Sequence, residues 1–506
     1  MLVENGNYWL CNREIDASEH ERLGRMKVHP SHAAAAAAFF CVPASAHFFV
    51  QSYTLPVPFA TYAWSAVGAL LATFLLSGLF LRARSAPRRL RRSEEHAVPN
   101  EVLRIGSLFG VGCLLICILC GLFGVQRAAD NLNMTMFWVG FVLLLPYATA
   151  VFGDVFIILN PWSTIGRMVD RMCQSPVIQI PSWVGCWPAF LLFLSFIYIE
   201  LFADLKPGGL SIALISYTSI IIAGSIAFGA RAWIRRAEFF SIMFRQISLI
   251  SPLAWKITKN PSGRPLVSVR FRAPVEGLLE HGSRLSSFTA VLVICFMLSS
   301  TSFDGIHNTL FWARIYWAEI YPHLKPLIAT GGGRDLSHAI SIFAIWQWLA
   351  LLLSPFLYIG LFLVACKLCR KIGRTRLGTL ELAKIFGISL VPIAFVYHFS
   401  HYYTLLVAYI GQLYRLASDP LGFGWDVFGT RGAGGGLVIL DMGNVWNTQV
   451  ASIIAGHVVS VFVAHVLALR MFRDARAAVF SQIPMLVLMM IFTWLGLWIL
   501  SLPLTS

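Results

Sequence analysis

The strongest constraint on the fold of this chain is a series of long apolar runs. From Phe59 almost to the C-terminus, stretches of roughly 18 to 25 residues recur, each able to cross a ~30 Å hydrocarbon core as a helix. Hydrophobic residues make up 57% of the 506 residues and charged residues 12%, which is too apolar for a soluble globule. The sequence therefore predicts an all-α, polytopic membrane protein with about ten transmembrane helices. We place these at 59–82, 104–125, 134–154, 183–203, 209–230, 285–303, 338–366, 381–414, 445–469 and 480–501.

The basic residues, which give a formal net charge of +15, predict the orientation of these helices. They gather in alternate connections, namely 82–92, 231–284, 367–376 and 470–476. Placing those connections and the 160–182 loop in the cytoplasm satisfies the positive-inside rule for every span, with both mature termini outside. We therefore expect a multi-pass protein of the inner (cytoplasmic) membrane, in contact with the lipid bilayer and with no nucleic-acid partner.

The N-terminal residues 1–46 read as a targeting segment rather than a folded domain. Met26-Lys27 begins a short basic stretch, Ala33 to Val42 is apolar, and Ala44-Ser45-Ala46 has the small-x-small pattern of a signal peptidase site. Cleavage there would leave His47 as the mature terminus. Its imidazole and free amine could bind copper, although the blander interpretation is that His47 merely follows a cleavage site.

The remaining chain, residues 47–506, is predicted to be a single helical transmembrane domain without a large soluble part. Its longest cytoplasmic connection is the basic loop at 231–284, where Glu238 to Leu249 predicts an interfacial amphipathic helix and Val267 to Arg272 a short strand. The outer loops include 303–337 and 415–444, and the second of these carries Asp419, Asp426 and Asp441.

Four histidines lie within two of the most apolar runs. His398 and His401 are three residues apart and His457 and His465 eight apart, so each pair shares one face of a helix. An ionisable group at membrane depth is costly and by default marks a functional site. By the topology above, His398, His401 and His457 lie in the outer half of the membrane and could meet. His465 lies deeper, at the level of Asp154, with which it could form a buried pair.

Six short segments resemble those of bacterial integral-membrane proteins called fenitrothion hydrolases, in the same order from about Ala46 to Arg470. These segments are Leu55-Pro56-Val57-Pro58, Phe152-Gly153-Asp154-Val155-Phe156 with Asn160-Pro161-Trp162, Ser300 to Gly305, His398-Phe399-Ser400-His401-Tyr402, Ala417 to Asp426, and Ala455-Gly456-His457 with Ala464-His465. The resemblance implies a membrane-bound phosphoric triester hydrolase that acts on lipophilic organophosphorus substrates and releases a nitrophenol. It also implies a second, different subunit.

Hydrolysis at phosphorus requires an activated water, polarisation of the P=S or P=O bond, and stabilisation of the departing phenolate. Histidine and carboxylate ligands to a metal commonly supply the first two. We therefore predict a divalent metal ion on His398, His401 and His457. For each of these histidines the alternative is a structural one, in which it makes a single hydrogen bond across a helix interface.

Three aspartates could serve as metal ligand or general base beside these histidines. Asp304 ends the sixth span, while Asp419 and Asp426 lie in the outer loop that follows the eighth. Each also has a structural interpretation, because aspartate readily caps helices and organises turns.

Two other classes of function remain open on the sequence alone. Paired histidines on neighbouring spans also suit a haem or copper site in an electron-transfer or metal-handling protein. The chain could instead be a transporter or a non-catalytic membrane subunit whose partner performs the chemistry. A visible spectrum would separate the first of these from a hydrolase.

Overall fold

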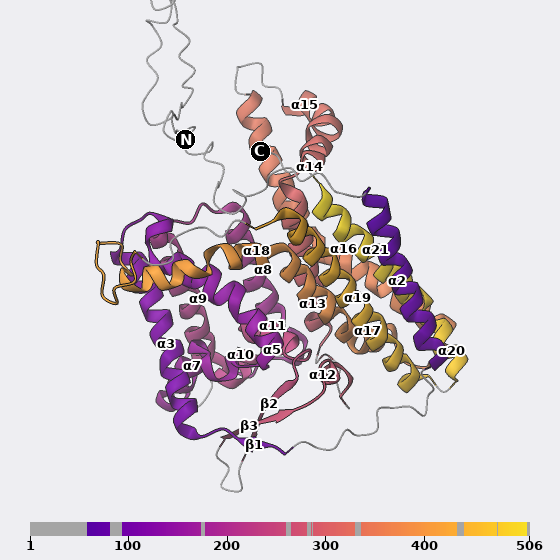
Figure 1. Ribbon diagram of the computed structural model, residues 1–506, viewed down its shortest axis with the longest axis horizontal. Helices are drawn as coiled ribbons and strands as arrows, with labels where there is room; N and C mark the ends of the chain where they lie inside the picture. The colour runs from indigo at the N-terminus through magenta and orange to yellow at the C-terminus, as the bar shows by residue number, and fades with distance from the viewer. Residues whose placement is uncertain are drawn as a thin grey trace, which may run out of the picture. The chain divides into compact units, whose positions relative to one another are not determined.

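The computed structural model describes residues 58–80, 94–173, 178–259, 265–280, 285, 287–328, 335–432, 440–472 and 474–502. All of these belong to one compact unit, residues 51–506 (Figure 1). The predicted signal segment, His47, the basic run 82–92 and the segment 55–57 lie outside the described residues.

The predicted all-α membrane fold is confirmed, because ten helical segments among the described residues are long and apolar enough to cross a bilayer. A lipid environment leaves no water for backbone groups, so each span satisfies its own hydrogen bonds as a helix. The spans are α2 (Phe59–Phe80), α3 (Asn100–Phe123), Leu132–Phe152, Ser182–Phe202, α9 (Pro207–Phe228), α13 (Phe288–His307), Ser337–Ile372, Thr379–Ser418, α19 (Met442–Met471) and Ala475–Ser501.

Several spans are composite. The third joins α4 (Leu132–Thr135), the π-helical η2 (Met136–Leu144) and α5 (Leu145–Phe152), and the fourth joins η3 (Ser182–Val184) to α8 (Trp187–Phe202). The seventh lies within α16 (Asp335–Ile372), whose 38 residues make it longer than a bilayer is thick. The eighth and tenth consist of α17 (Thr379–Phe386), η5 (Gly387–Leu390) and α18 (Val391–Ser418), and of α20 (Ala475–Ser481) and α21 (Ile483–Ser501).

Shorter elements connect the spans. They are η1 (Ala128–Asp130), α6 (Phe156–Leu159), α7 (Pro161–Met172), α10 (Ala230–Ala237), α11 (Phe239–Ile247), α12 (Glu276–Leu279), α14 (Leu310–Arg314), the π-helical η4 (Ile315–Ile320) and α15 (Tyr321–Ile328). Three antiparallel strands, β1 (His96–Ala97), β2 (Leu253–Lys259) and β3 (Pro265–Phe271), form a small sheet in the order β1-β3-β2 (Figure 1). The short strand predicted at 267–272 is thus present.

The helix predicted at 238–249 also exists, as α11, but its predicted interfacial position is wrong. Glu238 caps it by accepting from the backbone N–H groups of Phe240 and Ser241, and seven of its nine residues are buried. Its aromatic side chains explain the difference, since Phe240 packs within 4.6 Å of Phe141 between ring centroids, and Phe244 within 4.9 Å of Phe156. Apolar area of this kind is more stable inside the bundle than at its surface.

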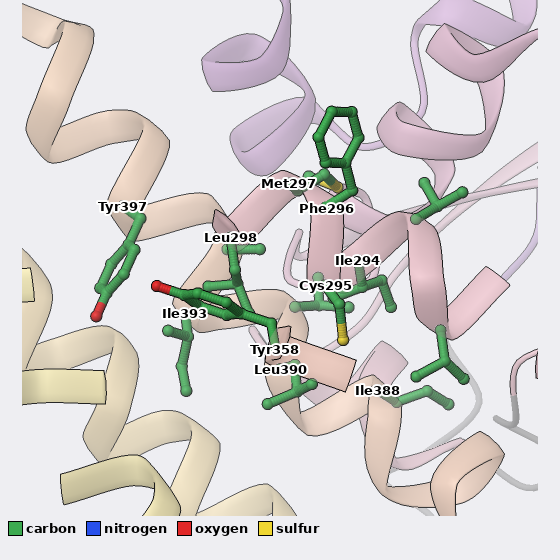
Figure 2. Packing of buried hydrophobic residues seen from close by; sticks show 14 of the residues in the cluster. Ile294, Cys295, Phe296, Met297, Leu298, Tyr358, Ile388, Leu390, Ile393 and Tyr397 are labelled. Carbon is green, nitrogen blue, oxygen red and sulfur yellow. The ribbon is translucent and has the colours of Figure 1, made fainter. Parts of the chain in front are cut away.

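Helix α13 is the centre of the half of the bundle that contains the histidines. In its most apolar window 89% of the residues are buried inside the protein, more than in any of the other nine spans. It packs against α16, α18, α8, α17 and α21. Figure 2 shows Leu298 of α13 beside Tyr358 of α16 and Ile393 of α18. Small hydroxyl residues such as Ser299 and Ser302 allow this close approach, and they bond to Ser354 and Tyr358 of α16.

Helix α18 connects this centre to the opposite side of the unit. With 28 residues it is about 42 Å long at ~1.5 Å per residue. Its first half packs on α13 and α19, whereas Leu416 near its end packs with Cys120 of α3 and Leu132 of α4. Figure 1 shows it running from α13 toward α3. Residues at the two ends of α18 therefore contact different helices.

Candidate functional site

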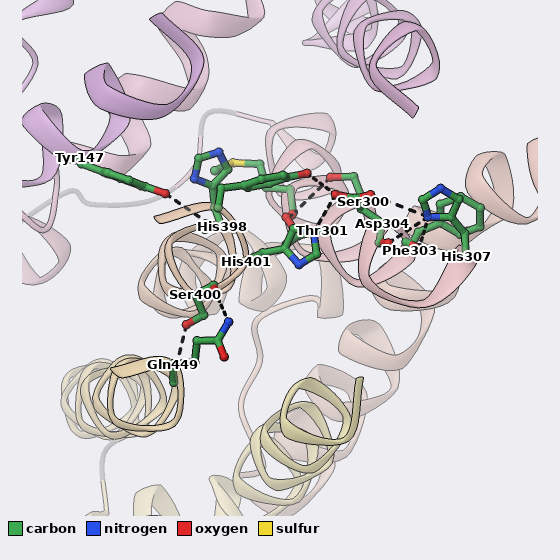
Figure 3. Close-up of polar contacts among 12 residues, drawn as sticks. Tyr147, Ser300, Thr301, Phe303, Asp304, His307, His398, Ser400, His401 and Gln449 are labelled. Carbon is green, nitrogen blue, oxygen red and sulfur yellow. Dashed lines mark hydrogen bonds and ion pairs between the residues drawn. The ribbon is translucent and has the colours of Figure 1, made fainter. Parts of the chain in front are cut away.

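Asp304 is the central residue of the candidate site. It lies in the last turn of α13 and is only 5% exposed. One carboxylate oxygen, Oδ2, accepts hydrogen bonds from Nε2 of His401 at 2.8 Å and from the Tyr402 hydroxyl at 2.6 Å (Figure 3). The other, Oδ1, lies 3.8 Å from Nδ1 of His307. The sequence prediction that Asp304 and His401 share a site agrees with this geometry.

The position of α18 against α13 explains why two consecutive residues reach one carboxylate. Neighbouring residues on an α-helix point about 100° apart, so both can contact an acceptor only where it faces the helix between them. Asp304 occupies that place beside His401 and Tyr402. Because an ionised carboxylate can only accept hydrogen bonds, we assign the proton of His401 to Nε2. This leaves the lone pair of the imidazole on Nδ1.

His307 is held separately, one turn after Phe303 on α13. Its Nδ1 donates to the backbone carbonyls of Asp304 at 2.9 Å and Phe303 at 3.2 Å, and its ring stacks on that of Phe303 at 5.3 Å. The imidazole therefore lies beside the carboxylate of Asp304 but is oriented by the helix backbone.

Glu200 is a member of this cluster that the sequence analysis missed. It lies near the end of α8, and its carboxyl interacts with the Tyr402 hydroxyl and with the charge of Asp304. The available signal was a glutamate within an apolar span, which is as costly as a membrane histidine. Tyr402 was part of a family-like segment but had no assigned role.

A pocket opens beside His401 between α13, α18, α19 and α21. Its empty volume of about 290 Å³ includes the solvent at its open mouth, and its enclosed part has room for little more than a water molecule. Gly305 leaves room at this edge, since a Cβ there would lie 3.8 Å from Nδ1 of His401 and 2.6 Å from Cγ2 of Ile499. The residues lining the pocket are Thr301, Ser302, Tyr397, Ser400, His401, Ile453, Gly496, Ile499 and Leu500.

His398 lies one turn before His401 but does not contact Asp304. Its ring lies between those of Tyr147 and Tyr402, at centroid distances of 5.7 and 5.0 Å, and its buried Nδ1 has no partner within the described part of the chain. Figure 3 shows its ring turned away from that of His401.

His457 is completely buried on α19, below the pocket. Its Nδ1 donates to the carbonyl of Ile453 at 2.8 Å, and its ring lies 5.8 Å from that of Tyr397. This hydrogen bond to its own helix leaves Nε2 as the free acceptor, and no donor reaches it from the described residues.

The three histidines do not form the metal site that we predicted. Across the described ranges, no group of three or more His, Cys, Asp or Glu side chains is arranged to hold a metal ion. The reason is that each imidazole has a different environment: His401 bonds to Asp304, His398 lies between tyrosines, and His457 bonds to its own helix. The three histidines lie at similar positions along their spans, as predicted, but their side chains point in different directions.

Asp419 and Asp426 are also separated from this site. His401 and the end of α18 are 17 residues apart, or about 26 Å along the helix axis. The carboxylate of Asp419 accepts from the backbone N–H groups of Phe423 at 2.9 Å and Gly424 at 2.8 Å. Asp426 accepts from the backbone of Arg431 at 3.0 Å. Both aspartates organise their own loop.

The suggested pair of His465 and Asp154 is not formed. The ring of His465 packs edge-on to Phe74 at 5.9 Å, whereas the charged groups nearest Asp154 are Arg245 and Glu238. The two residues therefore have different neighbours and do not pair.

The structure thus assembles a dyad, Asp304 and His401, with Tyr402, Glu200 and His307 around it and one pocket beside it. Comparison with known proteins adds no further information on identity. A scan against models of protein families, a search of curated proteins and a search of solved structures each gave no match.

Proposed function

We propose that this protein is a membrane-embedded hydrolase of lipophilic organophosphorus triesters, in which the Asp304–His401 dyad activates water. The observation that carries the proposal is the hydrogen bond from His401 Nε2 to Asp304 at 2.8 Å, beside a pocket lined by His401. The resemblance of six ordered segments to fenitrothion hydrolases supports the substrate class.

In the proposed step, a water in the pocket gives a proton to Nδ1 of His401 as its oxygen attacks phosphorus. Asp304 stabilises the resulting imidazolium, which a buried carboxylate at hydrogen-bond distance does well. The bond from phosphorus to the aryl oxygen then breaks, and the nitrophenolate leaves with the electron pair. Tyr402 helps to hold the carboxylate in place by donating to the same oxygen, Oδ2.

The pocket offers few free hydrogen-bond donors to stabilise the negative charge that develops on the phosphoryl oxygen. Three hydroxyl groups of the pocket are occupied by backbone carbonyls: Thr301 donates to Met297 at 3.1 Å, Ser302 to Leu298 at 3.0 Å, and Tyr397 to Phe492. Catalysis gains most from donors already aimed at the developing charge. We infer from this shortage that a different subunit, as the resemblance implies, completes the site.

The position of the pocket among membrane-spanning helices suits lipophilic triester substrates. Neutral phosphorothioate triesters partition into lipid, and the pocket lies among four spans of the bundle rather than in a soluble domain. A substrate could therefore enter from the membrane without first being concentrated in water.

The test is nitrophenol release by the purified chain in lipid nanodiscs, alone and with the co-expressed partner subunit. We expect activity that His401→Gln reduces at least about 100-fold, the usual contribution of a general base. Activity of the complex that is indifferent to His401→Gln would contradict the proposal and assign catalysis to the partner.

The haem and copper alternative is less well supported by the geometry. Axial ligation requires two imidazole nitrogens that face one another, whereas Nε2 of His401 bonds to Asp304 and the rings of His398 and His457 lie against different tyrosines, Tyr147 and Tyr397. A Soret band in the purified protein would nevertheless favour this alternative over the hydrolase.

A further inference from the structure

A second site lies at the other end of the bundle, on the paired helices α7 and α10. Gly166 of α7 contacts α10 closely, since a Cβ there would lie 2.9 Å from both Ala230 and Ile234. One turn later on α7, Asp170 accepts from the backbone N–H of Ala230 at 2.9 Å. Moving forward along α7 therefore means moving backward along α10, so the two helices are antiparallel.

This antiparallel pairing places four arginines on one side of the helix pair. In such a pair, the residues that directly follow the contact positions rotate to the same side. On α7 these are Arg167 and Arg171, and on α10 they are Arg231 and Arg235; all four are exposed. We call them the arginine patch.

The positive charge of the arginine patch is not neutralised by the protein. None of its four arginines forms an ion pair with a carboxylate within the chain segments that the structure describes. Arg167 bonds only to the hydroxyls of Thr164 at 2.9 Å and Ser107 at 3.4 Å. The nearby carboxylate of Asp170 is directed at the start of α10.

The position of the patch indicates the chemistry of its ligand. Arg167 reaches Ser107 in the first third of α3, and α10 follows directly on the end of α9, so the patch lies toward one membrane surface, near the level of lipid headgroups. Beside the arginines, Met168 and Met172 are 56% and 82% exposed. Methionine side chains at this level suit the boundary between headgroups and acyl chains, and guanidinium groups bind phosphate through paired hydrogen bonds.

We propose that the arginine patch is a binding site for the headgroup of an anionic phospholipid. The arginines would contact the phosphate while Met168 and Met172 contact the first carbons of the acyl chains. A patch of this kind also fixes the depth of α7 and α10 at the membrane surface. The proposal is independent of the hydrolase function.

The test measures binding of phosphatidylglycerol and of phosphatidylcholine to the purified full chain by native mass spectrometry. We expect phosphatidylglycerol to bind more tightly, and Arg231→Gln/Arg235→Gln to weaken it by about fivefold per arginine, a typical value near an anionic surface. Arg167→Gln/Arg171→Gln provides a second variant with the same expected effect.

The matched control is Arg370→Gln/Arg376→Gln, at and just beyond the end of α16. It removes the same charge from exposed arginines on the side that we predict to be cytoplasmic. We expect this variant to bind phosphatidylglycerol within about twofold of wild type, because one non-specific contact is a small part of such binding. Equal loss in both variants would overturn the proposal in favour of general surface charge.

Two other outcomes would also contradict it. Equal affinity for the two lipids would show that the patch does not recognise an anionic headgroup. Displacement of phosphatidylglycerol by inorganic phosphate alone would assign the patch to a free anion rather than to a lipid.

Discussion

Asp304 and Asp419 are almost equally buried, at 5% and 6% exposure, but their partners differ in kind. Asp304 is bound by the side chains of His401 and Tyr402, which come from a different helix. Asp419 is bound by its own loop, through the backbone N–H groups of Phe423 and Gly424, with the guanidinium of Arg431 3.9 Å away. Backbone donors hold a carboxylate in a fixed structural role, whereas an imidazole can exchange its proton. Burial alone therefore does not distinguish a reactive aspartate from a structural one.

The largest expected effect is that of Asp304→Asn on turnover. The amide keeps the shape of the side chain but cannot stabilise an imidazolium, so we expect kcat for nitrophenol release to fall by about 10²- to 10⁴-fold. Steady-state kinetics in nanodiscs measures this. Asp419→Asn is the matched control, with kcat expected to stay within about threefold of wild type. A loss in the control as large as in Asp304→Asn would remove the distinction between the two aspartates.

Asp154 is a third buried carboxylate, with no side-chain partner of the Asp304 type among the described residues. Burial, partly offset by Arg245, raises the pKa of Asp154 to about 7. The folded state thus holds the proton more tightly than the unfolded state, whose pKa is about 4, so stability falls as pH rises from about 4 through 7. We expect Asp154→Asn to remove this pH dependence, which amounts to at most about 4 kcal/mol in the free energy of unfolding.

Melting temperatures measured from pH 4.5 to pH 8 would show the effect of Asp154→Asn, with the exposed Asp204→Asn as control. If wild type and Asp154→Asn lose stability in parallel over this range, Asp154 is charged in the folded protein and our account of its burial is wrong.

Asp419→Ala should affect stability rather than chemistry. It removes the acceptor of two backbone N–H groups in the exposed loop, those of Phe423 and Gly424, and because water can take its place in part we expect a cost of about 1 kcal/mol per hydrogen bond. We expect a lower melting temperature with kcat per folded molecule unchanged. Reduced turnover at full stability would instead bring the 419–431 loop into the catalytic site.

Tyr402→Phe should have a smaller effect on turnover than Asp304→Asn. Removing one hydrogen bond to a charged group costs about 1.5 to 3 kcal/mol, so kcat should fall by roughly 10- to 100-fold with little change in KM. Tyr403→Phe is a matched control on the next position of α18, because its hydroxyl donates to the backbone of Val445 at 3.1 Å. Similar losses in both variants would indicate a structural effect of α18.

The smallest expected effect is that of His457→Gln, which we expect to retain kcat within about tenfold of wild type. His457 bonds to its own helix and is absent from the pocket lining. The predicted metal site makes the opposite claim, namely that His457→Gln abolishes activity and loses a stoichiometric metal. Elemental analysis of wild type, His401→Gln and His457→Gln decides between the two.

The sequence by itself determined the membrane fold and the elements that hold the site. Apolar runs between Phe59 and Ser501 must become helices in a bilayer because no other local structure satisfies the backbone there. It also placed Asp304 and His401 at compatible depths, since depth follows from distance along a span. It did not distinguish His401 from His398 or His457, which lie at similar depths.

Only the tertiary structure decided which ionisable side chains meet. Asp304 and His401 are 97 residues apart in the chain, and their contact depends on the rotation of α18 against α13. The same packing brings Glu200 of α8 close to Asp304. Asp419, in contrast, lies beyond the far end of α18. Rotation about a helix axis and side-chain direction arise from packing against neighbours, which the pattern of apolar residues along each span does not specify.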